Sequence, residues 1–306
     1  MYDIIGDIHG HADTLIQLLQ KLGYKKNKKG AFQHPTRKVL FVGDFIDRGP
    51  KIRESLEIVR LMMEAGTAQA VMGNHEYNAL CYHTNNAHGE PLRPHTAKNM
   101  HQHEATLKAF AQYPEDWKDY LNWFMDLPLW SETEHFRVVH ATWDNALIKE
   151  ATHKWQSNKL TATTLQSSAS KDSWDYDFIE LILKGKQIDL PDGQFFHDKD
   201  GHQRTEIRTQ WWKSPVGLTY AEYGLGAESC HITLSPEHQQ IVPYPATNDK
   251  PVFIGHYWLR GAPRLQSPLV CCTDYSVAKQ GSLVAYWWSG EQVLNVRNFV
   301  ACACVE

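Results

Sequence analysis

Three short glycine-containing motifs, each preceded by an apolar run, constrain the fold of this chain more than any other feature. They are GDIHG at residues 6–10, GDFIDRG at residues 43–49 and GNHE at residues 73–76. Their first residues lie 37 and 30 positions apart, about the length of one strand–helix–strand unit. Parallel strands connected in this way end at the same edge of a sheet, where α/β proteins bind their ligands. We therefore predict that the three motifs meet at one sheet edge.

The local periodicity of the N-terminal part agrees with this arrangement. Apolar runs over residues 2–5, 38–42 and 68–72 predict three strands, one directly before each motif. Apolar residues three and four positions apart predict helices between these strands, over residues 12–22 and 50–66. The pattern predicts an α/β fold.

The remaining elements are less regular. Helices are predicted over residues 104–112 and 115–126, followed by a strand over 136–140. Apolar runs near the C-terminus predict four strands of a second, largely antiparallel sheet, at residues 251–255, 269–273, 282–288 and 292–299.

Residues 145–250 are rich in Ser, Thr, Gln and Trp. A loop-rich stretch of this length inside a compact domain usually carries function. We interpret residues 1–306 as a single domain with its core in 1–145 and 250–306, and 145–250 as an insertion that caps the site. The two tryptophans of the WWKSP segment at 211–215 could stack on a nucleobase, but hydrophobic packing is the favoured interpretation.

Charge and cysteine content narrow the function classes. The chain has 35 acidic and 31 basic residues and a net charge of −4, without the basic stripe that binding to a phosphate backbone needs, so we expect no stable nucleic-acid binding. No run of 18 apolar residues and no secretory leader is visible, which predicts a cytoplasmic protein that does not enter the membrane. The six cysteines form no C-x-x-C pair, so we expect reduced thiols in the core.

The motifs supply the side chains of a two-metal hydrolytic centre. Asp7 and His9 are two positions apart, so an extended backbone would direct both to one metal, and Asp44 could bridge two. Two later histidines, His140 and His256, follow apolar strands and could complete the ligand shell of the second metal. The six candidate ligands are Asp7, His9, Asp44, Asn74, His140 and His256. Mixed oxygen and imidazole ligands favour two divalent ions, Mn²⁺ first, with Fe or Zn²⁺ as alternatives, over Mg²⁺.

Three further residues of the motifs have catalytic chemistry. His75 can protonate a leaving oxygen, because its ordinary pKa lies close to neutral pH. Asp47 can accept the other N–H of that imidazole. Arg48 offers a planar fork of donors to phosphate oxygens.

In this order the motifs resemble the signature of the calcineurin-like metallophosphoesterases, in particular the phosphoprotein phosphatase branch and its bacterial relatives near the PrpE-type phosphatases. The resemblance implies a four-layer sandwich of two mixed sheets flanked by helices. It also implies a ligand assignment in which Asp44 serves both metals: Asp7, His9 and Asp44 bind one, and Asp44, Asn74, His140 and His256 bind the other. His75 and Asp47 then form an acid dyad, and Arg48 binds phosphate.

Some positions depart from the family pattern. Met72 stands where phosphoprotein phosphatases usually have an arginine before GNHE, and Ala141–Thr142 replaces their Gly-Gly. Their second phosphate-binding arginine has no motif match, and Arg208 or Arg204 are the candidates. Asp47 and Glu76 in turn differ from the pattern of the dinucleotide hydrolases.

We predict a phosphatase that cleaves phosphomonoesters by in-line attack of a metal-activated hydroxide, with a phosphoserine, phosphothreonine or phosphotyrosine protein or a small phosphoester as substrate. One alternative is a nucleotidyl hydrolase acting on dinucleoside polyphosphates, 2′,3′-cyclic nucleotides or RNA ends. Another is a metal-bearing binding protein without catalysis. Five histidines within residues 83–103 are interpreted as solvated or structural, and Arg93 among them as a surface-loop residue that could reach substrate.

Overall fold

The protein is described by a computed structural model that covers residues 1–197, 203–241 and 249–306. Its first sheet contains all three strands predicted at the N-terminus. β1 (Tyr2–Ile5), β4 (Lys38–Phe41) and β5 (Ala68–Ala70) run parallel. β16 (Ser282–Trp288) pairs antiparallel with β1, and β15 (Asp274–Tyr275) and β17 (Phe299–Ala303) pair antiparallel with β16.

The second sheet has the strand order β14-β13-β7-β6. β7 (Arg137–Val139), β13 (Val252–Ile254) and β14 (Val270–Cys272) are parallel, and β6 (Trp130–Glu132) is antiparallel to β7. The prediction that the C-terminal strands form one largely antiparallel sheet is therefore wrong, because they divide between two sheets. The last strand also begins only at Phe299, after a short 3-10 turn. An apolar run indicates a strand but does not identify its partner.

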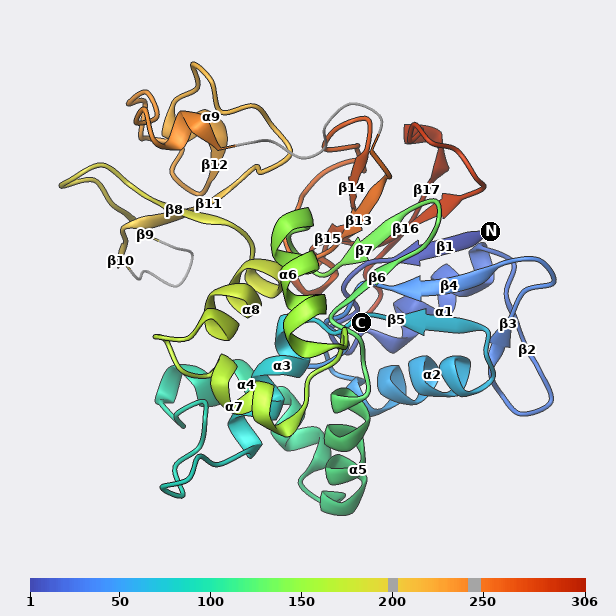
Figure 1. Ribbon diagram of the computed structural model, residues 1–306. Coiled ribbons are helices and arrows are strands. Elements are labelled where there is room, and N and C mark those ends of the chain that lie inside the picture. The colour runs from blue at the N-terminus through green and yellow to red at the C-terminus, as the bar shows by residue number, and fades with distance from the viewer. Residues whose placement is uncertain (198–202, 242–248) are drawn as a thin grey trace.

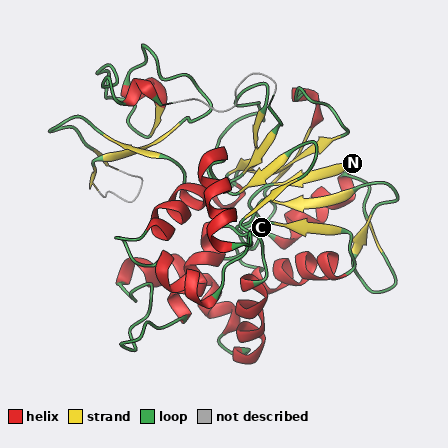
Figure 2. Cartoon of the chain, in the orientation of Figure 1, coloured by secondary structure: helices red, strands yellow, loops and turns green. Residues whose placement is uncertain are grey.

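The two sheets pack face to face, and helices cover their outer sides (Figures 1 and 2). Side chains alternate along each strand, so Ile4 and Leu40 of the first sheet meet Val138 and Phe253 of the second in a core between the sheets. Ile5 points the other way, into a larger core shared with the helices. The α/β class with two mixed sheets and flanking helices is confirmed.

The helices of the main body follow in chain order. They are α1 (Ala12–Lys21), α2 (Ile52–Glu64), α3 (Asn74–His83), α4 (Ala97–Phe110), α5 (Pro114–Met125), α6 (Asn145–Trp155), α7 (Ala162–Ser168) and α8 (Trp174–Lys184). The main body also contains a small hairpin, β2 (Lys25–Lys26) with β3 (Phe32–Gln33), and the 3-10 turns η2 (Val277–Lys279) and η3 (Val296–Asn298). A third 3-10 turn, η1 (His238–Gln240), lies in the 145–250 segment. The helices α6 and α8 contribute to the main core, as Ile148 and Ile182 show.

Part of the 145–250 segment forms a lobe beside the sheets, at the upper left of Figure 1. It contains β8 (Gln187–Asp189), β9 (Phe196–His197), β10 (Gln203–Arg204), β11 (Glu206–Thr209), α9 (Tyr220–Tyr223) and β12 (Gly224–Leu225). Its small core includes Ile188, Ile207 and Tyr223. Trp211 and Trp212 are buried in the main core, in agreement with the packing interpretation. The division of the chain into a core and a cap stays a prediction.

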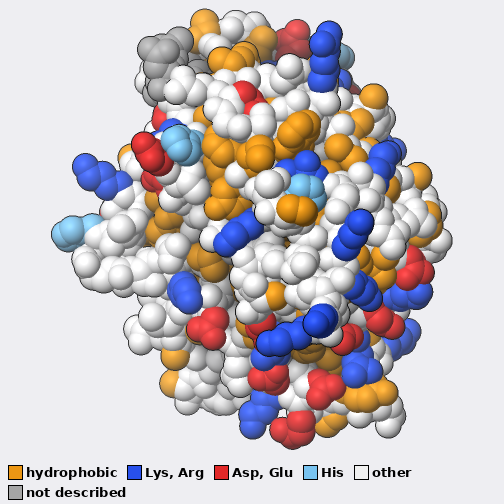
Figure 3. Space-filling model, turned by 90° about the vertical axis from the view of Figure 1, so that its right-hand side faces the viewer, with side chains coloured by type: hydrophobic (Ala, Val, Ile, Leu, Met, Phe, Trp, Pro, Cys, Tyr) orange, Lys and Arg blue, Asp and Glu red, His pale blue; other side chains and the backbone are white. Residues whose placement is uncertain are grey.

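Basic and acidic side chains are interspersed on the face drawn in Figure 3. Among the described residues, no helix is both long and apolar enough to cross a membrane. All six cysteines are unpaired, and four of them are buried, as expected for core thiols.

Candidate metal centre and active site

The six predicted ligands gather at the carboxyl ends of five strands, β1, β4, β5, β7 and β13. Asp7 lies just beyond β1 and Asp44 beyond β4, while Asn74 begins α3. His140 directly follows β7, and His256 follows β13. All six side chains belong to buried residues. The sheet edge predicted from the motif spacing is therefore where the candidate site lies.

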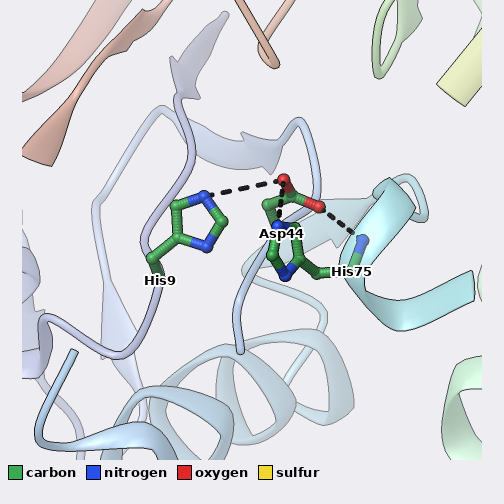
Figure 4. Close-up of side chains that lie close together, drawn as sticks. All are labelled: His9, Asp44 and His75. Atoms are coloured by element: carbon green, nitrogen blue, oxygen red, sulfur yellow. Dashed lines mark hydrogen bonds and ion pairs between the residues drawn. The ribbon is translucent and has the colours of Figure 1, made fainter. Parts of the chain in front are cut away.

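The Asp44 carboxylate lies at the centre of the cluster. Its Oδ2 atom is 3.4 Å from His140 Nε2 and 3.6 Å from His9 Nε2. Figure 4 shows the His9 ring to the left of it and the His75 ring below it, with His75 Nε2 4.0 Å away. Two groups of ligand atoms result, His9–Asp44–His75 and Asp44–His140–His256, and they share Asp44. Separations of this size suit side chains that each bind a common cation at about 2.0–2.2 Å.

Hydrogen bonds to backbone carbonyls orient the imidazoles. His9 Nδ1 donates to Ile46 O at 2.9 Å and His140 Nδ1 to Val42 O at 2.8 Å. In each neutral ring the Nε2 atom then carries the lone pair that can bind a metal. His256 Nε2 lies 3.0 Å from the Lys184 carbonyl, so its Nδ1 becomes the lone-pair atom.

Two of these lone pairs converge on another acceptor. Asn74 Oδ1 lies 2.7 Å from His256 Nδ1 and 3.1 Å from His140 Nε2. Asn74 Oδ1 and the neutral His256 Nδ1 are two acceptors that repel each other unless a cation lies between them. Asp7 Oδ1 and His9 Nε2 are also buried without a hydrogen-bond partner. The donor set therefore fits bound cations.

Glycines keep space around the two carboxylates. A Cβ atom at Gly73 would collide with Asp44 Oδ1, and one at Gly255 with Asp7 Oδ1. The other Asp7 oxygen accepts the His256 backbone N–H at 3.0 Å. The extended geometry predicted to direct Asp7 and His9 to one face ends at His9, whose φ is 45°, because the GDIHG segment turns there.

Burial sets the protonation of the ligands. It lowers the pKa of His9 to about 3 and that of His256 well below its ordinary value, so both are neutral. Burial opposes ionisation of Asp44, but the neighbouring His140 and His75 hold its pKa well below the ordinary value. Burial, together with repulsion from Asp274 and Asp44, raises the pKa of Asp7 well above its usual range. This concentration of buried carboxylate is what bound cations would neutralise.

Metal binding is expected to stabilise the folded protein. If Mn²⁺ at about 100 times its Kd binds only the folded state, it adds about 2.7 kcal/mol, which for a chain of 306 residues corresponds to a rise in Tm of roughly 4 °C. Calorimetry of chelator-treated protein with and without Mn²⁺ measures this shift. His256→Asn should lose most of the shift, whereas His135→Asn, whose side chain is 62% exposed, should keep it. Equal shifts in both variants would contradict the proposed site.

A second network surrounds Asp47. His75 Nδ1 lies 2.5 Å from Asp47 Oδ2, while His103 Nδ1 and Thr106 Oγ1 lie 2.9 and 2.5 Å from Asp47 Oδ1. Burial opposes ionisation of Asp47, but the hydrogen bonds from His103 and His75 hold its pKa below the ordinary value. Burial also lowers the pKa of His75, but Asp44 and Asp47 outweigh it and raise the pKa overall. His75 is therefore able to carry a proton.

Sequence reasoning missed the residues that position this network. His103 belongs to the histidine-rich segment that the sequence predicts to be solvated or structural. Its position with Thr106 and Phe110 on one buried face of α4 is a signal that could have identified it. Glu76 was noted only as a departure from a pattern. Its carboxylate accepts the N–H groups of Asp44, Phe45 and Gly73 at 2.8, 2.8 and 3.0 Å, and so ties the second motif to the third.

The site has an unusual backbone. Nine non-glycine residues of the described chain have a positive φ, and six of them belong to this region. They are His9, Asp44, Asp47, Arg48, His256 and Trp258. Such conformations persist only where the surrounding structure imposes them, and they concentrate at functional sites.

A cavity of about 820 Å³ opens onto the centre. Its lining includes Asn74, His75 and His256 of the predicted site. It also includes eight cationic side chains, Arg48, Arg93, Lys98, Lys171, Lys184, Arg204, Arg208 and Lys279, against the two carboxylates of Asp47 and Glu206. Because the whole chain carries a net charge of −4, this concentration of positive charge is local and favours an anionic ligand.

Comparison of the sequence with known protein families identifies the family of this chain. A sequence model described as calcineurin-like phosphoesterase matches residues 2–214. The chain belongs to this family. Phosphoesterases of this family use divalent metal ions, in agreement with the clustered His and Asp side chains.

Curated relatives include two kinds of tetraphosphatase. The asymmetrical bis(5′-nucleosyl)-tetraphosphatase PrpE of Halalkalibacterium halodurans is 48% identical over 75 residues, which cover 24% of this chain and 30% of the relative. The symmetrical bis(5′-nucleosyl)-tetraphosphatase of Vibrio cholerae is 33% identical over 159 residues, or 50% of each chain. The chain thus spans half or less of the length of these relatives.

The similarity of fold extends to a solved phosphatase. A protein serine/threonine phosphatase from Saccharomyces cerevisiae has a TM-score of 0.50 and 13% identity, covering 100% of this chain and 80% of that one. At this identity the likeness concerns the fold.

Proposed function

We propose that this phosphoesterase hydrolyses dinucleoside polyphosphates. The observation that carries the proposal is the cavity of about 820 Å³ in which eight cations face two carboxylates beside the metal centre. A site of this size takes a ligand as large as a dinucleotide, and several fixed cations suit a chain of phosphates. The names of the tetraphosphatase relatives support the same class. This proposal replaces the phosphoprotein substrate favoured by the sequence.

The side chains then take distinct roles. Asp7, His9 and Asp44 hold one cation, and Asp44 with Asn74, His140 and His256 holds the other. When bound, two divalent cations supply hydroxide near neutral pH and neutralise phosphoryl charge. Arg48, held over the ring of Trp258 at 5.9 Å, binds the transferring phosphoryl group, and His75 donates its proton to the leaving oxygen while Asp47 orients the imidazole.

Arg208 is our candidate for the second phosphate-binding arginine. It lines the cavity and acts electrostatically on His256. Burial lowers the pKa of its guanidinium, which means that this charge lies in a poorly solvated position where an anion stabilises it.

We also propose that residues 145–250 cap the site, since they contribute half of the cavity's cations, among them Lys171 and Lys184. The unpaired cysteines support a reducing, cytoplasmic location.

The second candidate is a protein phosphomonoesterase. The observation that favours it is the His75–Asp47 pair at 2.5 Å. Serine and threonine leave as poor alkoxides and need a general acid, whereas a nucleotide leaves a phosphoanhydride as an already stable anion. Protonation by the His75–Asp47 pair should therefore accelerate the hydrolysis of alkyl phosphate esters more than that of phosphoanhydrides.

A substrate panel tests the assignment. Turnover of diadenosine tetraphosphate, a phosphoserine peptide and 2′,3′-cyclic AMP is compared at a constant Mn²⁺ concentration. We expect the kcat/KM for diadenosine tetraphosphate to exceed that of the peptide by about tenfold or more, equivalent to about 1.4 kcal/mol in transition-state binding. A preference for the peptide would establish the second candidate. Binding of metal without turnover of any of the three would support the non-catalytic alternative.

A further inference from the structure

Arg93 is held in the wall of the active-site cavity by amides instead of carboxylates. Its Nη1 donates to Asn78 Oδ1 at 3.1 Å, and its Nη2 donates to Gln102 Oε1 at 2.8 Å. Among the described residues, no carboxylate forms an ion pair with it, and Asp47 and Glu180 act on it only at longer range. Its charge is therefore positioned but not neutralised.

The backbone around Arg93 is anchored to α3. The Arg93 N–H donates to Cys81 O at 2.9 Å, and the Leu92 N–H donates to Thr84 O at 2.8 Å. The ring of His95 stacks on Tyr82 with a centroid distance of 3.7 Å. Arg93 lies in a loop and is partly exposed, as the sequence-based interpretation expects. These contacts fix the loop, and the residue lines the cavity.

The same helix carries the metal site and the anchor of Arg93. Asn74 begins α3, and Asn78 lies four residues later, one turn along the same face and about 6 Å further along the axis. The guanidinium held by Asn78 thus has a fixed offset from the metal centre. Arg93 is therefore placed to bind a second anionic group of a substrate while the first anionic group lies at the metal centre.

Arg93 retains donors for a ligand. A guanidinium has five N–H groups, and the two amide contacts use two of them. Burial lowers the pKa of the Arg93 guanidinium, since desolvation disfavours its charge. Lys98 and Lys171 line the same cavity and have exposed side chains. A group with several anionic oxygens would compensate this buried charge.

We propose that Arg93, supported by Asn78 and Gln102 and assisted by Lys98 and Lys171, forms a second anion subsite that binds a phosphate of the substrate beyond the scissile one. Its ligand class is a linear polyphosphate, free or esterified to nucleosides. The identity of the biological substrate rests on the proposed function, whereas the binding of polyphosphate to this subsite does not depend on it. The subsite selects long phosphate chains over single phosphates.

Calorimetric titration tests the subsite without turnover. Mn²⁺-loaded protein, at constant free Mn²⁺, is titrated with orthophosphate and with a methylene-bridged triphosphate that resists hydrolysis. We expect the triphosphate analogue to bind the native protein about 10- to 100-fold more tightly than orthophosphate. This advantage is the ratio of the Kd for orthophosphate to the Kd for the triphosphate analogue. Arg93→Gln should reduce it about tenfold, as expected for the loss of a charge-assisted hydrogen bond. Arg93→Lys, which keeps the charge but loses the fork, should give an intermediate value.

Two further variants separate binding from folding. Lys98→Gln changes an exposed side chain and should reduce the advantage about two- to fivefold without altering Tm. Arg60→Gln, on the outer surface of α2 where Arg60 pairs with Glu64 and Asp119, should leave it unchanged. An equal loss of affinity for both ligands in Arg93→Gln, or an undiminished advantage in Arg93→Gln and Lys98→Gln, would overturn the subsite. Failure of the native protein to hydrolyse diadenosine tetraphosphate would instead overturn the proposed function alone.

Discussion

Replacing Asp44 with asparagine is expected to lower kcat by about 10³-fold or more and to reduce bound metal from two ions to one or none. Asp44 belongs to both groups of candidate ligands, and its Oδ1 accepts the His75 backbone N–H at 2.9 Å. The amide keeps the size of the side chain but removes its charge and one acceptor oxygen. A bound metal ion that is lost with its ligand takes away several kcal/mol of transition-state charge stabilisation, and each 1.36 kcal/mol corresponds to about a tenfold change in rate.

The measurement combines steady-state kinetics with elemental analysis of the purified variant. Asp172→Asn is a matched control, because Asp172 is an exposed residue outside the cavity lining. It should keep both the native rate and the native metal content. If Asp44→Asn retained two metal ions and more than about a tenth of the native kcat, a bridging role for Asp44 would be excluded.

Replacing His75 with asparagine is expected to lower kcat by about 10²- to 10⁴-fold for an alkyl phosphate, the range that general acids contribute. The loss should be much smaller for p-nitrophenyl phosphate, because nitrophenolate leaves without a proton. The physical basis is the contact of His75 with Asp47 at 2.5 Å and the raised pKa of the imidazole. The ratio of kcat for the two substrates, in native protein and variant, measures the effect.

The pH dependence gives an independent check. Since the pKa of His75 is raised, its acid form is present below that pKa and is lost as the pH rises through it. The native profile for the alkyl phosphate should therefore fall on its alkaline side, and the variant should lack this fall. His101→Asn, which changes an exposed side chain, is the control. An equal loss of rate for both leaving groups would show that His75 acts in some way other than proton donation.

Motif spacing was sufficient to predict the location of the site. Each of the three N-terminal motifs follows a strand of one parallel set, so local pattern and connection length together determine which strand ends meet. The same reasoning applies to His140 and His256, because each follows a short apolar strand. The positions of candidate ligands at strand ends are predictable for this reason.

Residues that act through distant partners could not be predicted in the same way. His103 contacts Asp47, which is 56 positions away, and Arg93 acquires its environment from α3 and α4 together. Asp274 is buried and accepts the Trp258 backbone N–H at 2.6 Å, although nothing in its local sequence indicates it. The pairing of the C-terminal strands was missed for the same reason. These features depend on tertiary packing, which a local pattern does not encode.

The left-handed backbone of the site residues implies a conflict between stability and activity. For an L-residue this conformation costs roughly 1–2 kcal/mol, a cost that glycine avoids. Glycine at Arg48 or Trp258, whose φ values are 69° and 51°, would relieve strain but remove a side chain from the cavity wall. Selection for thermal stability alone should therefore enrich glycine in these loops and erode the site. A stabilised variant of this chain is best sought elsewhere in the fold, where conformational strain and chemistry are not located in the same residues.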